Sequence, residues 1–259
     1  MTIQVTAGPE AGRGNYRDSV DALASAQKPS YGAPAYSVFV NRPAGRYLAA
    51  GAHQLGLTPN AVTLLSALCS YIAIACLALL RPTVGTGVVV GVLLMLGYAL
   101  DSADGQLARL RGGGSRLGEW LDHMVDSIKI SSLHLAVLIT VFRYFGFRPG
   151  WLLVPIGYAV VSAVTFFGMI LIDQLRAGVI AKATRPGDVS QRRALARSLA
   201  VLPNDYGFLC VVFLLLGFHH LFFGVYAALL VCNVGFLGLA LRKWARQMKA
   251  VDELSSPSP

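Results

Sequence analysis

This sequence is poor in charged residues, and that scarcity excludes most soluble proteins. Only 14% of its 259 residues are Asp, Glu, Lys or Arg, whereas 55% are hydrophobic, and the mean hydropathy is +0.58. An ordinary soluble domain has about 25% charged residues. The composition therefore predicts a polytopic membrane protein.

Acidic residues are especially few. The chain has 13 Asp and Glu against 22 Lys and Arg, which leaves a net charge of +9. In a soluble protein such an excess would suggest a nucleic-acid partner. In a membrane protein it is typical of basic cytoplasmic loops beside anionic lipid. We therefore expect membrane lipid, and no nucleic acid, as a partner.

Cysteine is also scarce. Cys69, Cys76, Cys210 and Cys232 all fall inside apolar segments, without the spacing of zinc ligands, so we interpret them as small core residues. The N-terminus has no charged start followed by an apolar run. This pattern predicts no signal peptide.

What the chain does contain is a series of apolar runs, most of them near the ~20 residues that a helix needs to cross a bilayer. Thr58-Pro59 is a typical helix start, with a hydroxyl cap and Pro in the first turn. The fifth run is short. We expect an all-α bundle of six transmembrane helices, at about 58–80, 83–110, 117–145, 151–176, 205–218 and 221–241.

The flanks of these runs differ in character. Residues 1–32 are polar and lack periodicity, which predicts a disordered tail. Residues 33–56 are half apolar, which favours an amphipathic helix in the membrane interface, broken at Pro43. We therefore expect the membrane domain over residues 57–248 and a C-terminal tail over residues 249–259.

The basic residues alternate along the loops. The N-terminal segment, the turn at 109–116, the connection at 177–203 and the C-terminal tail are rich in Arg and Lys. The loops between them are poorer. By the positive-inside rule, both termini and the 109–116 turn are expected on the cytoplasmic side of the cell membrane.

Four carboxylates stand out in the second and third runs. Asp101 and Asp104 share one helix face, and Asp122 and Asp126 share another. An Asp at the centre of a spanning helix costs roughly 2.5–3.5 kcal/mol on insertion scales. A Gly-rich turn makes the two helices antiparallel, so both pairs can converge and hold one or two Mg²⁺-like ions.

The residues around the acids favour an anionic ligand. Gly105 and Ala108 leave a groove beside the carboxylates, and Gly118 permits close helix packing. Arg109 follows at the membrane edge, where its guanidinium can meet phosphate. A metal site with a neighbouring Arg and a small-residue groove suits a nucleotide diphosphate better than a free ion.

The pattern Asp-x2-Asp-Gly-x2-Ala-Arg-x8-Gly-x3-Asp-x3-Asp, from Asp101 to Asp126, resembles the signature of the CDP-alcohol phosphotransferases. Every signature position matches. The six-run outline and the Thr58-Pro59-Asn60 entry with Thr63 are also similar to that family, so the resemblance covers about Ala33 to Leu241.

The resemblance implies a six-helix membrane enzyme, usually a homodimer, with two Mg²⁺ or Mn²⁺ ions. It implies that Asp126 is also the general base, which takes the proton of an acceptor alcohol as CMP leaves. The implied metal ligands are Asp101, Asp104, Asp122 and Asp126, and the implied CDP site consists of Asn60, Thr63, Gly105, Ala108 and Arg109.

The substrates stay open at this point. Most bacterial-type members of the family use CDP-diacylglycerol and a polar alcohol in phospholipid biosynthesis. The stretch from Ser115 to Ser127 also resembles the choline/ethanolamine phosphotransferase branch, which uses a CDP-amino alcohol and diacylglycerol. Lys129, Arg176 and Lys182 are candidates for binding a phosphorylated acceptor.

Two other classes also use acids in membranes. A membrane prenyltransferase holds diphosphate with acidic pairs, but its motifs lie in two widely separated repeats. A cation transporter would be expected to show inverted repeats or broken helices at mid-membrane. Neither feature is present in the sequence, so we rank both below the phosphotransferase.

Overall fold

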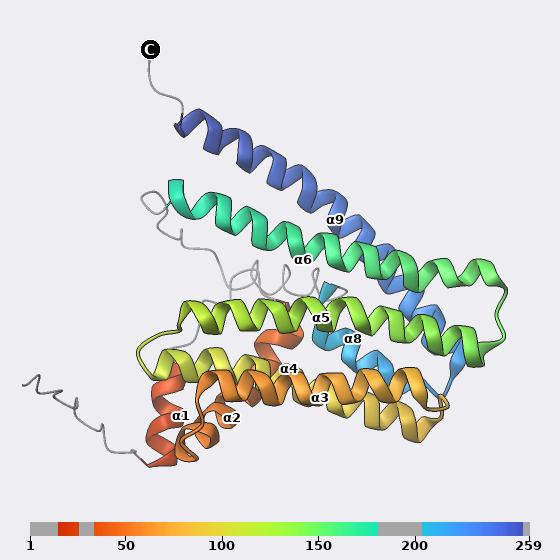
Figure 1. The fold of residues 1–259 in the computed structure, drawn as a ribbon, viewed down its shortest axis with the longest axis horizontal. Helices are drawn as coiled ribbons and strands as arrows, with labels where there is room; N and C mark the ends of the chain where they lie inside the picture. The colour runs from red at the N-terminus through yellow and green to blue at the C-terminus, as the bar shows by residue number, and fades with distance from the viewer. Residues whose placement is uncertain (1–14, 26–33, 181–203, 256–259) are drawn as a thin grey trace, which may run out of the picture.

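The computed structural model describes residues 15–25, 34–180 and 204–255. Within these ranges the chain is helical and has no strand (Figure 1). The α-helices are α1 (Tyr16–Ser25), α2 (Arg42–Gln54), α3 (Pro59–Leu79), α4 (Val84–Leu110), α5 (Arg116–Thr140), α6 (Leu153–Ile180), α8 (Tyr206–Val212) and α9 (His219–Ser255).

Five of the described helical segments are long and apolar enough to cross a membrane. They are Pro59–Leu79, Val84–Leu110, Arg116–Phe145, Pro149–Arg176 and His219–Glu253. They correspond to the first four predicted spans and to the sixth. The chain is therefore a multi-pass membrane protein, as the composition predicted.

The predicted fifth span is much shorter than expected. The seven-residue α8 and a three-residue 3-10 turn, Phe213–Leu215, together rise only roughly 15 Å, about half the hydrocarbon thickness of a bilayer. The helix begins at Tyr206, and the carboxylate of the preceding Asp205 caps it by accepting a hydrogen bond from the Gly207 N–H at 2.9 Å. Residues 181–203 lie outside the described residues, so the described chain supports five spans and one short apolar helix.

Hydroxyl side chains cap the N-terminal ends of α3, α4 and α5, where the first backbone N–H groups have no partner within the helix. The hydroxyls of Thr58, Thr83 and Ser115 each accept a hydrogen bond from the N–H three residues later, at 3.2, 3.1 and 3.0 Å. Such caps satisfy one of the free N–H groups of the first turn. The start predicted at Thr58-Pro59 is confirmed by the first residue of α3, Pro59.

The helix break that was predicted at Pro43 is absent, so that prediction was wrong. The chain stays helical from Ala35 to Gln54, and a wider π-helical turn, Ser37–Asn41, comes directly before α2. Proline cannot donate a backbone hydrogen bond, and its ring crowds the preceding turn. A π-helical turn just before Pro43 accommodates both effects without ending the helix.

The prediction of disorder before residue 33 was also wrong for part of that segment. Residues 16–25 form α1, which packs on α2 through the fully buried Leu23. The Tyr16 hydroxyl donates a hydrogen bond to the backbone oxygen of Tyr47 at 3.2 Å. A helix of 10 residues is marginal in isolation, so contact with α2 provides the stability that its own sequence pattern did not reveal. At the other end, α9 continues to Ser255, beyond the predicted start of the C-terminal tail at residue 249.

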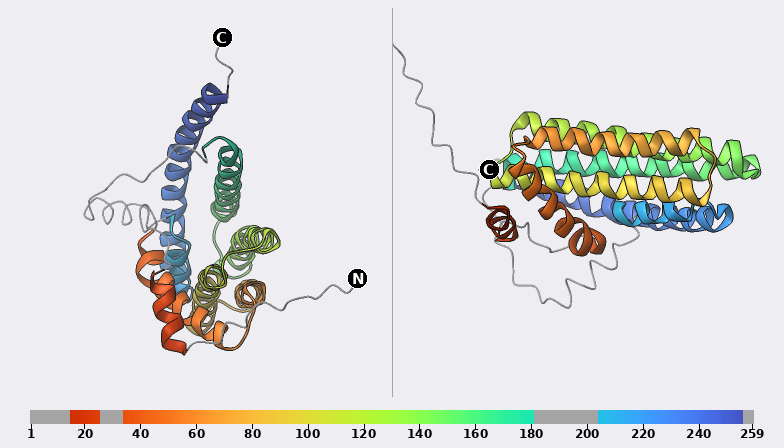
Figure 2. Two further views of the ribbon diagram at one scale, coloured as in Figure 1. Left: turned by 90° about the vertical axis from the view of Figure 1, so that its left-hand side faces the viewer. Right: turned by 90° about the horizontal axis from the view of Figure 1, so that it is seen from below.

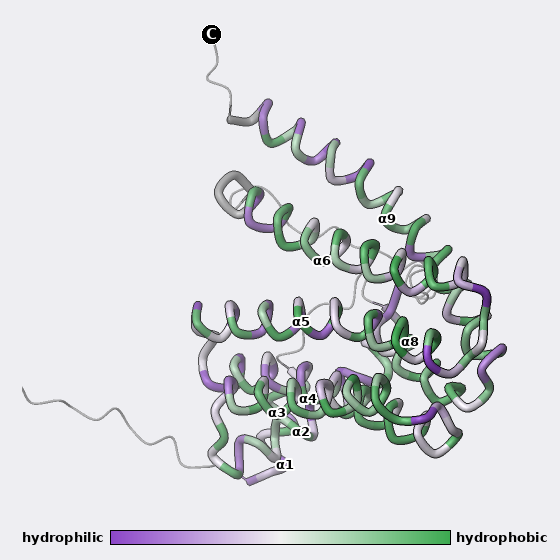
Figure 3. The backbone as a smooth tube through the Cα atoms, turned by 45° about the vertical axis from the view of Figure 1, so that its right-hand side comes forward, coloured by the Kyte–Doolittle hydropathy of each residue, from purple (hydrophilic) through white to green (hydrophobic). Residues whose placement is uncertain are grey.

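The long helices run along a common direction (Figures 1 and 2). Helix α3 packs against α4 and α5, α5 packs against α6, and α6 packs against α9. Helices α6 and α9 lean away from α5 towards the end where α4 joins α5 (Figure 1). Apolar residues follow the length of the spans in Figure 3, and large ones such as Phe142, Phe167 and Leu239 are exposed, as lipid-facing positions require.

Two apolar cores hold the bundle together. The larger one joins α3, α4, α5, α6, α8 and α9 in the half of the bundle far from the α4–α5 turn, through residues such as Leu94, Leu133 and Phe213. The smaller one joins α1, α2, α3 and α4 near that turn, through Leu23, Val62 and Leu107. On α4, Asp101 lies between the buried residues of the two cores, and Asp104 lies between Ala103 and Leu107 of the smaller core.

Helix α2 lies very close to the acidic part of α4. A Cβ atom at Gly45 would lie 2.8 Å from both the Gln106 Nε2 atom and the Ser102 Oγ atom. Gln106 in turn donates a hydrogen bond to the backbone oxygen of Arg42 at 3.0 Å. Helix α2 therefore packs tightly against the part of α4 that carries Asp101 and Asp104.

Candidate active site

The four predicted acids come from two adjacent antiparallel helices. Asp101 and Asp104 lie towards the end of α4, and Asp122 and Asp126 lie in the first half of α5. The turn between the helices contains Gly112 and Gly113 with φ angles of +93° and +131°, a backbone region that favours glycine. This turn brings the two acidic helix faces together.

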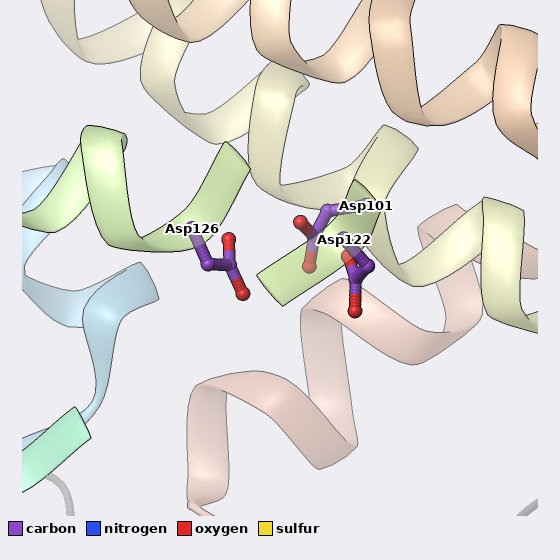
Figure 4. Close-up of side chains that lie close together, drawn as sticks. All are labelled: Asp101, Asp122 and Asp126. Carbon is purple, nitrogen blue, oxygen red and sulfur yellow. The ribbon is translucent and has the colours of Figure 1, made fainter. Parts of the chain in front are cut away.

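Three of the four carboxylates converge closely. One oxygen from each of Asp101, Asp122 and Asp126 lies within 4.8 Å of the others (Figure 4). Two oxygen ligands on opposite sides of one Mg²⁺ or Ca²⁺ ion lie roughly 4–5 Å apart. The donor set therefore fits a hard divalent cation in both chemistry and spacing.

Asp104 is held differently from the other three acids. It is buried, and the Thr63 hydroxyl of α3 lies 2.5 Å from its Oδ2 atom as a hydrogen-bond donor. The same hydroxyl lies 3.2 Å from the backbone oxygen of Pro59 in its own helix. Thr63, predicted to belong to the nucleotide site, thus directly supports one of the predicted metal ligands.

A buried lysine touches the acids on their other side. The Lys129 Nζ atom donates to Asp126 Oδ1 at 2.6 Å and to Asp101 Oδ1 at 3.1 Å. Lys129 is only 2% exposed, and its ammonium lies 5.6 Å from the centroid of the Tyr206 ring. A buried ammonium is costly unless it is paired, and these two carboxylates pair it.

A cavity of about 760 Å³ opens beside the acids. All five residues predicted for the nucleotide site line it, together with Asp104 and Asp122. The further lining residues are Thr58, Pro59, Arg111, Gly113, Gly114, Ser115, Arg116, Gly118, Glu119 and His123. The structure therefore gathers Asn60, Thr63, Gly105, Ala108 and Arg109 around one space.

The cavity is suited to negative charge. Three arginines line it: Arg109, Arg111 and Arg116. The N-terminal ends of α3 and α5 also meet it, because their capping residues Thr58 and Ser115 are among its lining residues. Free backbone N–H groups and the helix dipole favour anions at such ends.

Gly118 lies where α5 approaches α3 closely. A Cβ atom at Gly118 would lie 3.0 Å from the Asn60 Oδ1 atom and 3.2 Å from the Ser115 Oγ atom. Gly118 was predicted to permit close packing. The contact shows which packing it permits: the amide of Asn60 lies directly against α5 at the cavity wall.

A second cavity, of about 170 Å³, lies between α5, α6, α9 and the start of α8. His134 lines this cavity and contacts three side chains around it. Its Nδ1 atom lies 2.6 Å from the Tyr226 hydroxyl, and its Nε2 atom lies 3.0 Å from the Ser162 hydroxyl. Its ring stacks on Tyr158. Asp205, at the same cavity, accepts hydrogen bonds from backbone N–H groups, including that of Ser37 at 3.1 Å.

Sequence reasoning left several residues of the site without a role. Arg111, Arg116 and Glu119 were not assigned, although their positions beside the signature were a usable signal. Lys129 was predicted as a candidate for binding an acceptor phosphate, and its pairing with the acids was not predicted. Arg176 lies near the end of α6, and Lys182 lies outside the described residues.

The helical bundle and the acid cluster define the class of this chain as a multi-pass membrane protein with converging carboxylates on its membrane-spanning helices. A model of the CDP-alcohol phosphatidyltransferase family matches residues 56–241. The chain therefore belongs to that family, as its signature predicted.

Two curated relatives are similar over part of the chain. Cholinephosphotransferase 1 of Xenopus laevis is 32% identical over 104 residues, which are 38% of this chain and 25% of the relative. Archaetidylinositol phosphate synthase of Pyrococcus horikoshii is 32% identical over 86 residues, which are 33% of this chain and 43% of the relative. The chain thus spans less than half the length of both relatives.

Solved structures of a phosphatidylinositol phosphate synthase from Mycobacterium tuberculosis are also similar. The complex with manganese and citrate gives a TM-score of 0.48 at 20% identity and covers 76% of this chain and 87% of that chain. The structure with CDP-DAG bound gives a TM-score of 0.47 at 20% identity and covers 79% and 93%.

Proposed function

We propose that the chain transfers a substituted phosphate group from a CDP-linked lipid, CDP-diacylglycerol, to the hydroxyl of an acceptor alcohol and releases CMP. One observation carries this proposal: a single cavity is lined by Asn60, Thr63, Ala108 and Arg109 and also by two of the acids. A nucleotide in this cavity would have its diphosphate next to the arginines and the carboxylates.

Asp126 is the residue that we assign as general base. Its Oδ1 atom accepts a hydrogen bond from Lys129, so we assign Oδ2 to the acceptor hydroxyl. The acceptor oxygen attacks the lipid-bearing phosphorus, a P–O bond forms, and the bond from that phosphorus to the CMP phosphate oxygen breaks. The proton of the hydroxyl passes to Asp126, and CMP leaves with the bonding electron pair.

Arg109 and the helix ends stabilise the leaving group. Arg109 and the first residues of α5 line the cavity, where they would stabilise the negative charge that develops on CMP. Asp101, Asp104, Asp122 and Asp126 would hold divalent ions, Mg²⁺ or Mn²⁺. When bound, such ions neutralise the charge on the transferring phosphoryl group.

The assay is CMP release by the purified full-length protein with Mg²⁺, CDP-diacylglycerol and a panel of alcohols. Release that depends on the acceptor and is abolished in D126N supports the proposal. D173N is the matched control, because Asp173 is an exposed acid on α6 and does not line the cavity. Prenyl transfer or ion flux without CMP release would contradict the proposal.

A second candidate function is the same phosphotransfer with different substrates. Cholinephosphotransferase 1 is 32% identical over its matched part, and the stretch from Ser115 to Ser127 is similar to that branch. The enzyme would then take a CDP-amino alcohol as donor and diacylglycerol as acceptor. CMP release with CDP-choline and diacylglycerol, and none with CDP-diacylglycerol, would favour this candidate.

We also propose that the cavity faces the cytoplasm. The end of the bundle that holds the cavity carries Arg109, Arg111 and Arg116, and α2 and the end of α9 contribute further basic residues there (Figure 1). The opposite end has Arg81, Arg143 and Arg148. The charge bias supports a cytoplasmic cavity and C-terminus, where CDP-linked donors are accessible. A homodimer stays a prediction of the family resemblance.

A further inference from the structure

Lys129 lies outside the family signature, which ends at Asp126, yet it forms ion pairs with two members of the acid cluster. Its ammonium contacts one oxygen of Asp126 at 2.6 Å and one oxygen of Asp101 at 3.1 Å. It lies one helical turn after Asp126 on α5 and is 2% exposed. An ammonium in this position occupies the space between two carboxylates, as a bound cation does.

The acid cluster has two unequal sides. Asp104 and Asp122 line the large cavity. Asp101 and Asp126 do not line it, and both hold Lys129. A ligand entering the cavity therefore meets the Asp104 and Asp122 side first, while the other side already contains a positive charge.

Charge balance makes this difference consequential. Four carboxylates with Lys129 and one divalent ion carry a single net negative charge. With two divalent ions and Lys129, the same site carries a net positive charge in a membrane segment, where excess charge is costly. A diphosphate brings negative charge of its own and makes a second ion favourable again.

We propose that Lys129 is the resident cation of the Asp101 and Asp126 side. The substrate-free protein then binds one divalent ion, with Asp122 as an essential ligand, and takes up a second only together with a nucleotide diphosphate. The inference rests on the proposed function in assigning divalent ions to the acid cluster. In this view Lys129 is a positioning residue that keeps the Asp126 carboxylate oriented until substrate arrives.

The test counts Mn²⁺ ions bound per full-length protein, by equilibrium dialysis with metal analysis and by electron paramagnetic resonance. Without nucleotide, the wild type is expected to bind one ion, and K129M, which removes the charge at similar size, is expected to bind two. K129R keeps the charge and is expected to bind one. A purely structural lysine would change stability without changing this count.

Two further variants locate the single ion. D126N is expected to retain one ion in the absence of nucleotide, because Asp126 is then paired with Lys129. D122N is expected to lose it. Addition of CDP is expected to raise the wild-type count from one to two and to leave K129M at two.

Two bound ions in the wild type without CDP would overturn the inference, and so would one ion in K129M. If K129M yields no folded protein even when purified in Mn²⁺, the inference is tested by the number of Mn²⁺ ions that the wild type binds with and without CDP. CMP release, measured on the same preparations, keeps the two proposals separate. If the wild type releases CMP but binds two ions without nucleotide, only the inference about Lys129 fails. If it binds one ion without nucleotide but releases no CMP from any donor, only the proposed function fails.

Discussion

Thr63 on α3 and Asp104 on α4 lie 41 residues apart in the sequence and are joined by a hydrogen bond of 2.5 Å. Both side chains are buried, and both line the large cavity. The first span therefore determines the position of a carboxylate on the second. This relationship leads to the first prediction.

Replacing Thr63 with Val removes the hydroxyl and preserves the shape of the side chain. Hydrogen bonds to charged groups contribute about 1.5–3 kcal/mol, so kcat/KM for CMP release is expected to fall roughly 10–150-fold. T63S retains a hydroxyl and is expected to restore most of the activity. Equal activity of T63V and the wild type would show that Asp104 does not depend on this contact.

Replacing Gly118 with Ala should disturb the wall of the cavity that we propose binds the nucleotide. The new Cβ atom would lie 3.0 Å from Asn60 Oδ1, so the Asn60 amide must move. We expect KM for the CDP-linked donor to rise by about tenfold, on the order of 1.4 kcal/mol, with a smaller change in kcat. G235A is the control, because no atom lies within 4 Å of a Cβ atom at that glycine of α9.

Replacing Gly45 with Ala tests how α2 supports α4. The Cβ atom would lie 2.8 Å from Gln106 Nε2 and from Ser102 Oγ, and overpacking of this kind costs about 1–3 kcal/mol. The melting temperature of the purified protein is expected to fall. G51A lies on the same helix with nothing within 4 Å and is expected to leave stability unchanged or raise it slightly. An equal effect of both variants would contradict the packing argument.

The proposed orientation can be checked with introduced cysteines. Gly114, in the α4–α5 turn, and Gly150, at the opposite end of the bundle, both have open space where a side chain would be placed. In intact cells, a membrane-impermeant maleimide is expected to label G150C and to label G114C only after the membrane is opened. The reverse pattern would place the cavity outside the cell.

Removal of divalent ions should abolish turnover reversibly. Treatment with EDTA is expected to reduce CMP release to the level of D126N, and Mg²⁺ or Mn²⁺ is expected to restore it, since carboxylate oxygens are the ligands these ions prefer. Full activity in EDTA would show that the acid cluster works without a metal ion. The D173N control should respond to EDTA as the wild type does.

The sequence by itself determined the membrane class, the position of most spans and the residues around the cavity. Hydropathy acts over runs of about 20 residues, and the acid signature lies within two neighbouring helices, so both are local properties. Asn60 and Thr63 were reached only through the family resemblance, because they lie on a different helix.

The tertiary structure decided everything that depends on contacts between distant segments. The packing of α1 on α2, the continuous helix through Pro43 and the short α8 were not visible in the pattern of apolar residues. The separation of Asp104 from the other three acids depends on Thr63. The pairing of Lys129 with Asp101 depends on the antiparallel approach of α4 and α5 across 28 positions. Sequence spacing determines which side chains share a helix face, but only packing determines which charge fills the space between two faces.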